Sequence, residues 1–351
     1  MDTPGRLNAN LDKFIENNRT NIMKYIRLGQ TGLEVSRICL GMMSYGDPTV
    51  SKWTLPLDEA RPIIKKALDL GINFFDTANV YSKGKSEEIT GQLLGDYRDE
   101  VVIATKVFFP MRGFTEASLP NQSGLSRYHI YRAIDESLQR LNLKYVDLYQ
   151  IHRLDPNVPL ENILRTLNHL IDQGKVLHIG ASSMFAWQFA KSLWIADKYG
   201  LEPFQTMQNH YNLLYREEER EMLPLCKDQG IGVIPWSPLA RGFLTGKYSS
   251  KKPMPSARFQ HDKYLKTRYF KPEDFKIVER VVTIAQEKDI SPAQVALAWL
   301  FSKEVITAPI VGITKLSYVE EIVGALDVKL TTDEIKRLEE FYTPHSIIGH
   351  S

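Results

Sequence analysis

The segment Gly71-Ile72-Asn73-Phe74-Phe75-Asp76 sets the pattern of this sequence, because it is a short apolar run that follows a glycine and ends in a carboxylate. It comes directly after an amphipathic stretch whose apolar residues recur at helical spacing. These residues are Ala60, Ile63, Ile64, Ala67 and Leu68. Gly71 is the residue type expected just beyond the end of such a helix. A helix that leads into a buried strand is the repeating unit of an α/β protein.

Similar apolar runs occur along the whole chain. They cover residues 37–41, 101–106, 145–152, 176–182, 204–208, 231–236 and 305–311. Near-continuous apolar runs predict parallel strands that are buried on both faces. Helical spacing recurs between them, as in residues 126–141, where Ser126 is placed to cap a helix, and in residues 160–171, which precede Gly174.

Eight strands joined by helices fit either a doubly wound sheet or a (β/α)8 TIM barrel. The count favours the barrel, and the chain has no G-x-G-x-x-G motif for a doubly wound sheet. Residues 25–35 are expected to form a hairpin that closes the lower end. Long loops are expected after strands 3 and 7, at residues 108–125 and 238–272, on the face that carries barrel active sites. We interpret residues 1–22 as a flexible extension and residues 23–351 as a single barrel domain.

Composition narrows the class of function. The 44 Lys and Arg residues nearly balance the 42 Asp and Glu residues in a chain of 351, which argues against nucleic-acid binding. No apolar stretch approaches the ~18 residues that a membrane span needs. Two cysteines, Cys39 and Cys226, fit a reducing compartment, so we expect a cytoplasmic protein. The absence of H-E-x-x-H, C-x-x-C and G-x-S-x-G motifs predicts no metal site and no such hydrolase.

Ionisable residues close three consecutive apolar runs: Asp76, Lys106 and His152, with Tyr81 one short loop beyond Asp76. Each has an ordinary explanation when taken alone, as a turn residue, a lysine that reaches solvent or a packed histidine. Together at one end of a barrel they favour a catalytic site. The set suits carbonyl reduction, because a phenol can donate a proton and a nearby ammonium lowers its pKa. A buried carboxylate would hold that ammonium, and a histidine would orient the carbonyl.

Several ordered motifs resemble those of the aldo-keto reductase superfamily. They are residues 71–81 (GINFFDTANVY), 104–106 (ATK), 147–152 (DLYQIH), 180–183 (GASS) and 235–239 (PWSPL). Residues 182–190, 208–221 and 347–350 are similar to the fungal aryl-alcohol dehydrogenase branch. The resemblance implies a (β/α)8 barrel with Tyr81 as the proton donor. It assigns Asp76, Lys106 and His152 as the partners of that tyrosine.

The resemblance also implies that an extended NADP(H) lies across the barrel mouth. Trp236 would stack on the nicotinamide, and Asp76, Ser182, Ser183 and Gln208 would contact that end. The residues implied for the pyrophosphate and the adenosine phosphate are Ser237, Leu239, Arg241, Lys247 and Arg258. Those implied for the adenosine end are Gly312, Thr314, Lys315, Tyr318 and Glu321. A core position for Trp236 and a solvated basic loop are the alternatives.

The expected substrate is a small carbonyl compound or alcohol. Its pocket would be apolar and aromatic, lined by Met42, Met43, Trp53, Phe108, Phe109, Met111 and Phe114, although these residues could instead pack beneath the loops. We therefore expect an NADP(H)-dependent oxidoreductase that interconverts aldehydes, aryl or other apolar ones, and primary alcohols. One alternative is an NADP(H)-binding regulatory subunit of a membrane channel with only slow catalysis. Another is a barrel lyase or isomerase without nicotinamide.

Overall fold

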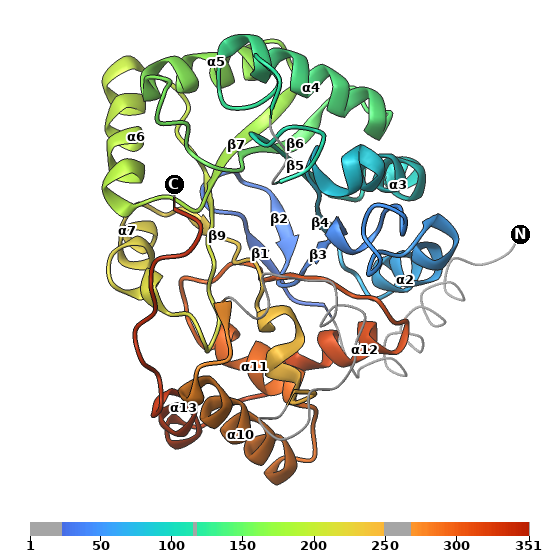
Figure 1. Ribbon diagram of the computed structural model, residues 1–351, viewed down its shortest axis with the longest axis vertical. Coiled ribbons are helices and arrows are strands. Elements are labelled where there is room, and N and C mark those ends of the chain that lie inside the picture. The colour runs from blue at the N-terminus through green and yellow to red at the C-terminus, as the bar shows by residue number, and fades with distance from the viewer. Residues whose placement is uncertain (1–22, 115–117, 249–267, 351) are drawn as a thin grey trace, which may run out of the picture.

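The structure is a computed structural model that describes residues 23–114, 118–248 and 268–350. Residues 1–22, interpreted above as an extension, and the candidate cofactor residue Arg258 lie outside the described residues. The described chain forms a (β/α)8 barrel, as predicted, with strands at the centre and helices around them (Figure 1).

Each of the eight apolar runs overlaps one parallel strand of the barrel. The strands are β3 (Cys39–Gly41), β4 (Phe74–Asp76), β5 (Val102–Val107), β6 (Val146–Ile151), β7 (Val176–Ser182), β8 (Thr206–Gln208), β9 (Gly232–Val233) and β10 (Ile310–Val311). They follow one another in the sheet in the order β10-β3-β4-β5-β6-β7-β8-β9. Parallel bridges Val233↔Ile306 and Trp236↔Ile310 join β9 and the residues after it to β10 and the residues before it. The sheet therefore closes, which leaves no long unpaired edge.

Helices cover the outside of this sheet. They are α2 (Leu57–Asp69), α3 (Lys85–Leu94), α4 (Arg127–Leu141), α5 (Leu160–Asp172), α6 (Ala186–Tyr199), α7 (Met222–Asp228), α10 (Pro272–Glu287), α11 (Pro292–Phe301), α12 (Ser317–Gly324) and α13 (Thr332–Glu339). Ser126 caps α4 as expected, because its Oγ accepts a hydrogen bond from the backbone N–H of His129 at 3.2 Å. Gly71, just beyond α2, has a left-handed φ of 84°. The local signals read from the sequence thus act where they were predicted.

The predicted hairpin closes the barrel end at which the strands begin. Strands β1 (Tyr25–Arg27) and β2 (Glu34–Ser36) pair antiparallel. Leu28 and Val35 from the hairpin are fully buried in an apolar cluster inside that end. The cluster also contains Cys39, Phe74, Val102, Ala104, Leu148, Ile234, Ala308 and Ile310. Apolar side chains therefore fill the lower end of the barrel.

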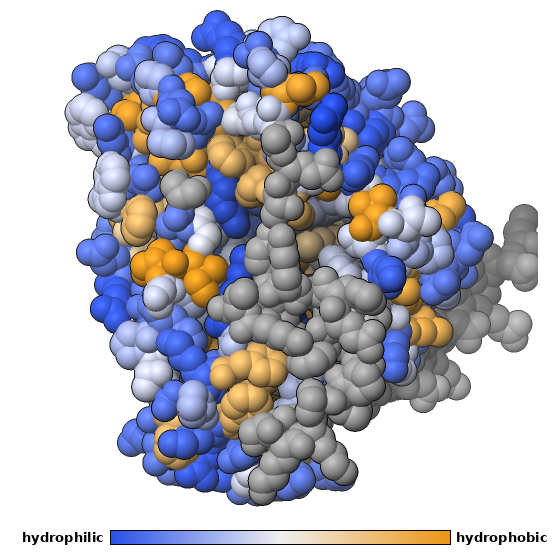
Figure 2. Space-filling view, viewed as in Figure 1, coloured by the Kyte–Doolittle hydropathy of each residue, from blue (hydrophilic) through white to orange (hydrophobic). Residues whose placement is uncertain are grey.

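Long loops follow strands β5 and β9, again as expected. Described residues 108–114 and 118–126 contain neither helix nor strand, whereas the second loop begins with a 3-10 helix, η5 (Ala240–Thr245). The face viewed in Figure 2 is mostly hydrophilic, with apolar residues in small groups. Among the described helices, none combines the length and the apolar character needed to cross a membrane. In the same part of the chain, no three His, Cys, Asp or Glu residues are grouped to hold a metal ion.

Candidate active site

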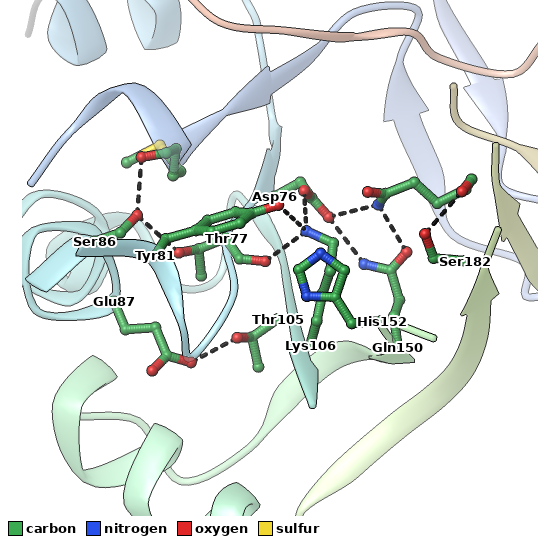
Figure 3. Close-up of polar contacts among 12 residues, drawn as sticks. Asp76, Thr77, Tyr81, Ser86, Glu87, Thr105, Lys106, Gln150, His152 and Ser182 are labelled. Carbon is green, nitrogen blue, oxygen red and sulfur yellow. Dashed lines mark hydrogen bonds and ion pairs between the residues drawn. The ribbon is translucent and has the colours of Figure 1, made fainter. Parts of the chain in front are cut away.

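The site is built around a lysine ammonium that is fully buried at the end of β5. Lys106 Nζ donates to Asp76 Oδ1 at 2.5 Å, to the carbonyl oxygen of Thr77 at 2.8 Å and to the Tyr81 hydroxyl at 3.2 Å (Figure 3). Burial by itself lowers the pKa of Lys106, but the charge of Asp76 and the hydrogen bonds outweigh it, and the pKa is raised. The ammonium is therefore charged and held by three acceptors.

Tyr81 reaches this ammonium because the chain after β4 turns sharply. Tyr81 begins a short 3-10 segment, η2 (Tyr81–Gly84), in which Ser82, Lys83 and Gly84 all have left-handed φ angles of 50°, 54° and 92°. Such angles are costly for residues with a Cβ, so the surrounding structure must hold them. One such contact is the hydrogen bond from the Asp47 backbone N–H to Ser82 Oγ at 2.8 Å.

The pKa of the Tyr81 hydroxyl is raised above that of an ordinary tyrosine. Burial is the largest cause, while the positive charge of Lys106 and its hydrogen bond lower the pKa in the opposite sense. Burial thus outweighs the nearby ammonium, which was the only influence on this pKa expected from the sequence. Tyr81 therefore carries its proton at neutral pH.

His152 lies edge-on to Tyr81, with 5.8 Å between the ring centroids. Burial, Lys106 and Arg153 together hold the pKa of His152 well below its ordinary value, so the imidazole is neutral. Phe109 and Phe114 pack against the same histidine at centroid distances of 4.9 Å and 5.8 Å. The four predicted residues Asp76, Tyr81, Lys106 and His152 thus come together. They lie beside an aromatic wall formed by Phe109 and Phe114.

Only part of the expected substrate pocket joins that wall. Met43, Phe109 and Phe114 pack against a small apolar cluster of Ala78, Val80 and Tyr81, and Phe108 contacts the ring of Phe109 at 5.1 Å. Met42 instead belongs to the main core of the barrel. The expected pocket residues that pack against the cluster containing Tyr81 are therefore mainly aromatic.

Gln150 is a site residue that the sequence analysis missed. Its Nε2 donates to Asp76 Oδ2 at 2.9 Å, and its Oε1 accepts from Gln208 Nε2 at 2.9 Å. Gln208 also donates to Asp76 Oδ2 at 3.0 Å. Asp76 thus accepts a hydrogen bond from Lys106 on one oxygen and from the two amides of Gln150 and Gln208 on the other. The signal was its position on β6 two residues before His152, because alternate residues of a strand face the same side.

The residues expected at the nicotinamide end gather beside this network. Ser182 Oγ donates to the carbonyl oxygen of Gln208 at 2.9 Å, and Trp236 Nε1 donates to Ser183 Oγ at 3.1 Å. The Trp236 ring is half-buried rather than in the core, and it stacks on His210 with 4.1 Å between centroids. His210 thus packs against one face of the indole. It was not among the predicted site residues.

Three of the residues expected at the phosphate and adenosine end, Lys247, Lys315 and Tyr318, lie close together. Lys247 Nζ donates to the Tyr318 hydroxyl at 2.8 Å, and Lys315 Nζ lies 5.5 Å from the centre of the same ring. Gly312 and Thr314 are exposed in the loop after β10, while Glu321 is half-buried on α12. Ser237 and Arg241 have left-handed φ angles of 54° and 57° around η5, next to the half-buried Leu239.

These residues fit a dinucleotide. The ammonium groups of Lys247 and Lys315 both lie within 5.5 Å of the centre of the Tyr318 ring, and neither forms an ion pair with a carboxylate of the described chain. Left-handed residues in a tight turn expose backbone N–H groups of the kind that bind phosphates. At the other end, hydroxyl and amide groups lie beside a half-buried indole, which suits a flat polar ring. One donor set therefore suits phosphate and the other suits an aromatic amide.

Comparison with known proteins gives consistent matches. A model described as the Aldo/keto reductase family matches residues 37–343. A versiconal hemiacetal acetate reductase of Aspergillus parasiticus is 43% identical, over 93% of this chain and 98% of that protein. A Schizosaccharomyces pombe protein named as a candidate aryl-alcohol dehydrogenase is 42% identical, over 92% and 96% of the two chains. An aldo-keto reductase of Metarhizium robertsii is 42% identical, over 93% of each.

Proposed function

The chain belongs to the aldo/keto reductase family, and from that premise we propose that it is an NADP(H)-dependent oxidoreductase that interconverts aldehydes, aryl or other apolar ones, and primary alcohols. One observation carries the proposal: a buried ammonium is hydrogen-bonded both to the Asp76 carboxylate and to the Tyr81 hydroxyl. The aromatic residues beside Tyr81 support an aryl substrate. The names of the relatives, as reductases and a candidate aryl-alcohol dehydrogenase, support the same reaction class.

In this mechanism Tyr81 is the proton donor. Reducing a carbonyl adds a hydride to carbon and a proton to oxygen, and bound NADPH supplies the hydride. Tyr81 holds its proton until the carbonyl oxygen gains negative charge, because burial raises its pKa. Lys106 then stabilises the phenolate that remains, and Asp76 keeps Lys106 charged and in place. General-acid catalysis of this kind contributes about 10²–10⁴-fold in rate.

His152 orients the carbonyl. A neutral imidazole donates a single N–H, so it can bind the carbonyl oxygen without bringing a second full positive charge next to Lys106. Its ring is fixed by the edge-on contacts with Tyr81 and Phe109. The substrate oxygen would therefore lie between two groups whose positions the barrel has already set, which reduces the ordering needed for reaction.

The cofactor would lie across the mouth. Ser182, Ser183, Gln208 and Trp236 would hold its nicotinamide end, and the turn at Ser237 and Arg241 would contact the pyrophosphate. Lys247 and Lys315 supply the charge that favours a 2′-phosphate, and hence NADP(H) over NAD(H). Arg258 stays a candidate for the same phosphate. The cytoplasmic location expected from the cysteines also stays part of the proposal, with Cys39 and Cys226 both buried and free.

Tyr81→Phe tests the proposal, with NADPH oxidation followed across aryl, aliphatic and sugar aldehydes. We expect kcat to fall by about 10²–10⁴-fold, while the Kd for NADPH, from fluorescence titration, changes by less than about threefold. Tyr149→Phe is the matched control, since it removes a hydroxyl from another fully buried tyrosine, on β6. Unchanged turnover in Tyr81→Phe would remove that residue from its role. Tight NADPH binding with extremely slow turnover of every compound would instead indicate the regulatory subunit.

A further inference from the structure

Arg153 follows His152 directly at the end of β6, and its guanidinium lies beside the candidate site. Its Nη1 donates to the carbonyl oxygen of His152, and its guanidinium carbon is 5.7 Å from the centre of the Phe109 ring. A Cβ placed on Gly349, in the C-terminal tail, would lie 3.4 Å from Arg153 Nη2 and 3.4 Å from Ser183 Oγ. The guanidinium therefore sits between the aromatic wall, the tail and the expected nicotinamide end.

This charge has no carboxylate partner within residues 23–114, 118–248 and 268–350. The nearest acid in sequence, Asp155, is engaged elsewhere: its oxygens accept from the backbone N–H groups of Leu125 at 2.8 Å and Asn157 at 3.0 Å. Other partly buried arginines are paired, such as Arg98 with Asp147 and Arg140 with Glu87. A half-buried charge that no carboxylate of the described residues balances is unfavourable, so a carboxylate brought by a ligand would stabilise this arginine.

The guanidinium is also electrically coupled to the reacting groups. The charge of Arg153 lowers the pKa of Tyr81 and of His152, in the same direction as the charge of Lys106. Burial lowers the pKa of Arg153 to about 10, so it stays charged at neutral pH. A series of ring contacts connects Tyr81 with Arg153: Tyr81 contacts His152 and Phe114, these rings and Phe109 contact one another at 4.9–5.8 Å, and Arg153 contacts Phe109.

We propose that Arg153 recognises a carboxylate on the substrate, so that the preferred substrates are aryl aldehydes and alcohols that carry a carboxylate on the ring. The inference rests on the proposed function, because it names the substrate class of the same site. The planar guanidinium of Arg153 matches the two oxygens of a carboxylate, and a planar substrate ring would pack against Phe109 and Phe114. The aldehyde at the far end of such a molecule is then directed to Tyr81 and His152.

The test compares two aldehydes of the same shape, 4-carboxybenzaldehyde and its neutral amide, 4-carbamoylbenzaldehyde, with the full-length enzyme and NADPH. We expect the natural protein to favour the carboxylate at least 10-fold in kcat/KM. Arg153→Gln should lower that ratio at least 10-fold, since hydrogen bonds to charged groups are worth about 10- to 100-fold in affinity. Arg153→Lys keeps the charge without the fork and should give an intermediate ratio, and it also serves if the Gln variant does not fold.

Arg132→Gln is the matched control, because it removes the same charge from an exposed position on α4 and should leave the ratio unchanged. No preference in the natural protein, or an unchanged ratio in Arg153→Gln, would overturn the inference while turnover of the neutral aldehyde upheld the proposed function. A loss of NADPH affinity in Arg153→Gln, with the ratio unchanged, would assign the arginine to the cofactor. Failure to reduce any aldehyde would overturn the proposed function and the inference together.

Discussion

Two successive layers of side chains inside the barrel have the same burial but opposite chemistry. The lower layer contains apolar residues, and the upper layer contains polar or charged ones two positions further along the same strands. The pairs are Phe74 and Asp76 on β4, Ala104 and Lys106 on β5, and Leu148 and Gln150 on β6. Since alternate residues of a strand face the same side, two residues are enough to pass from the core to the candidate site.

The two layers differ in what they contribute. Burying each large apolar side chain in the lower layer stabilises the fold by about 1.5–3 kcal/mol. In the upper layer, the Asp76–Lys106 attraction must first offset the desolvation of both charges, so it is a weak source of stability. The hydrogen bonds of the upper layer instead fix where its side chains lie. They join Lys106, Asp76, Gln150 and Gln208. Along each of these strands, the lower residue thus contributes mainly to stability and the upper residue mainly to the candidate site.

Leu148→Ala should produce the largest change in stability and leave the chemistry nearly intact. Leu148 is fully buried in the lower layer, so truncation leaves a cavity and lowers the free energy of unfolding by about 2–5 kcal/mol. Urea denaturation measures that loss, and kcat/KM per folded molecule should stay within about twofold. A fall in kcat/KM of tenfold or more would show that the two layers are not separable.

The layered arrangement was only partly readable from the sequence. Apolar runs predicted every strand of the barrel, and the ends of those runs predicted that Asp76, Lys106 and His152 would meet, because parallel strands end on one face. Gln150 was missed because the sequence does not show which side chains it contacts, although its position two residues before His152 placed it on the same side of the strand. The net pKa shift of Tyr81 required knowledge of its burial, which no motif gives. The contact between Lys247 and Tyr318 joins segments far apart in sequence.

Gln150→Leu should have the opposite effect to Leu148→Ala on the same strand. The variant keeps the volume but removes one donor to Asp76 and the acceptor for Gln208, so we infer that Gln150 is a positioning residue. We expect kcat to fall about 10-fold, or about 1.4 kcal/mol, while the free energy of unfolding changes by less than about 1 kcal/mol. Unchanged kcat, or a stability loss as large as that of Leu148→Ala, would contradict this role.

His152→Gln should change the pH dependence of stability, which is the smallest of these effects. In the folded protein the pKa of His152 lies well below its ordinary value, whereas in the unfolded chain it returns to about 6.5. Between those values the unfolded state binds a proton that the folded state does not. His152 therefore lowers the free energy of unfolding as the pH falls below about 6.5. Above that pH the histidine is neutral in both states and has no such effect.

The contribution of His152 should amount to about 1 kcal/mol between pH 7 and pH 5.5. His152→Gln removes the titrating group, so its unfolding free energy should fall less steeply over this range than that of the natural protein. Urea denaturation at several pH values measures both slopes. Leu148→Ala is the control, because the lower layer loses no titratable group and its slope should match that of the natural protein. An equal slope in His152→Gln would mean that His152 is not kept neutral by burial, and the upper layer would then hold a second positive charge beside Lys106.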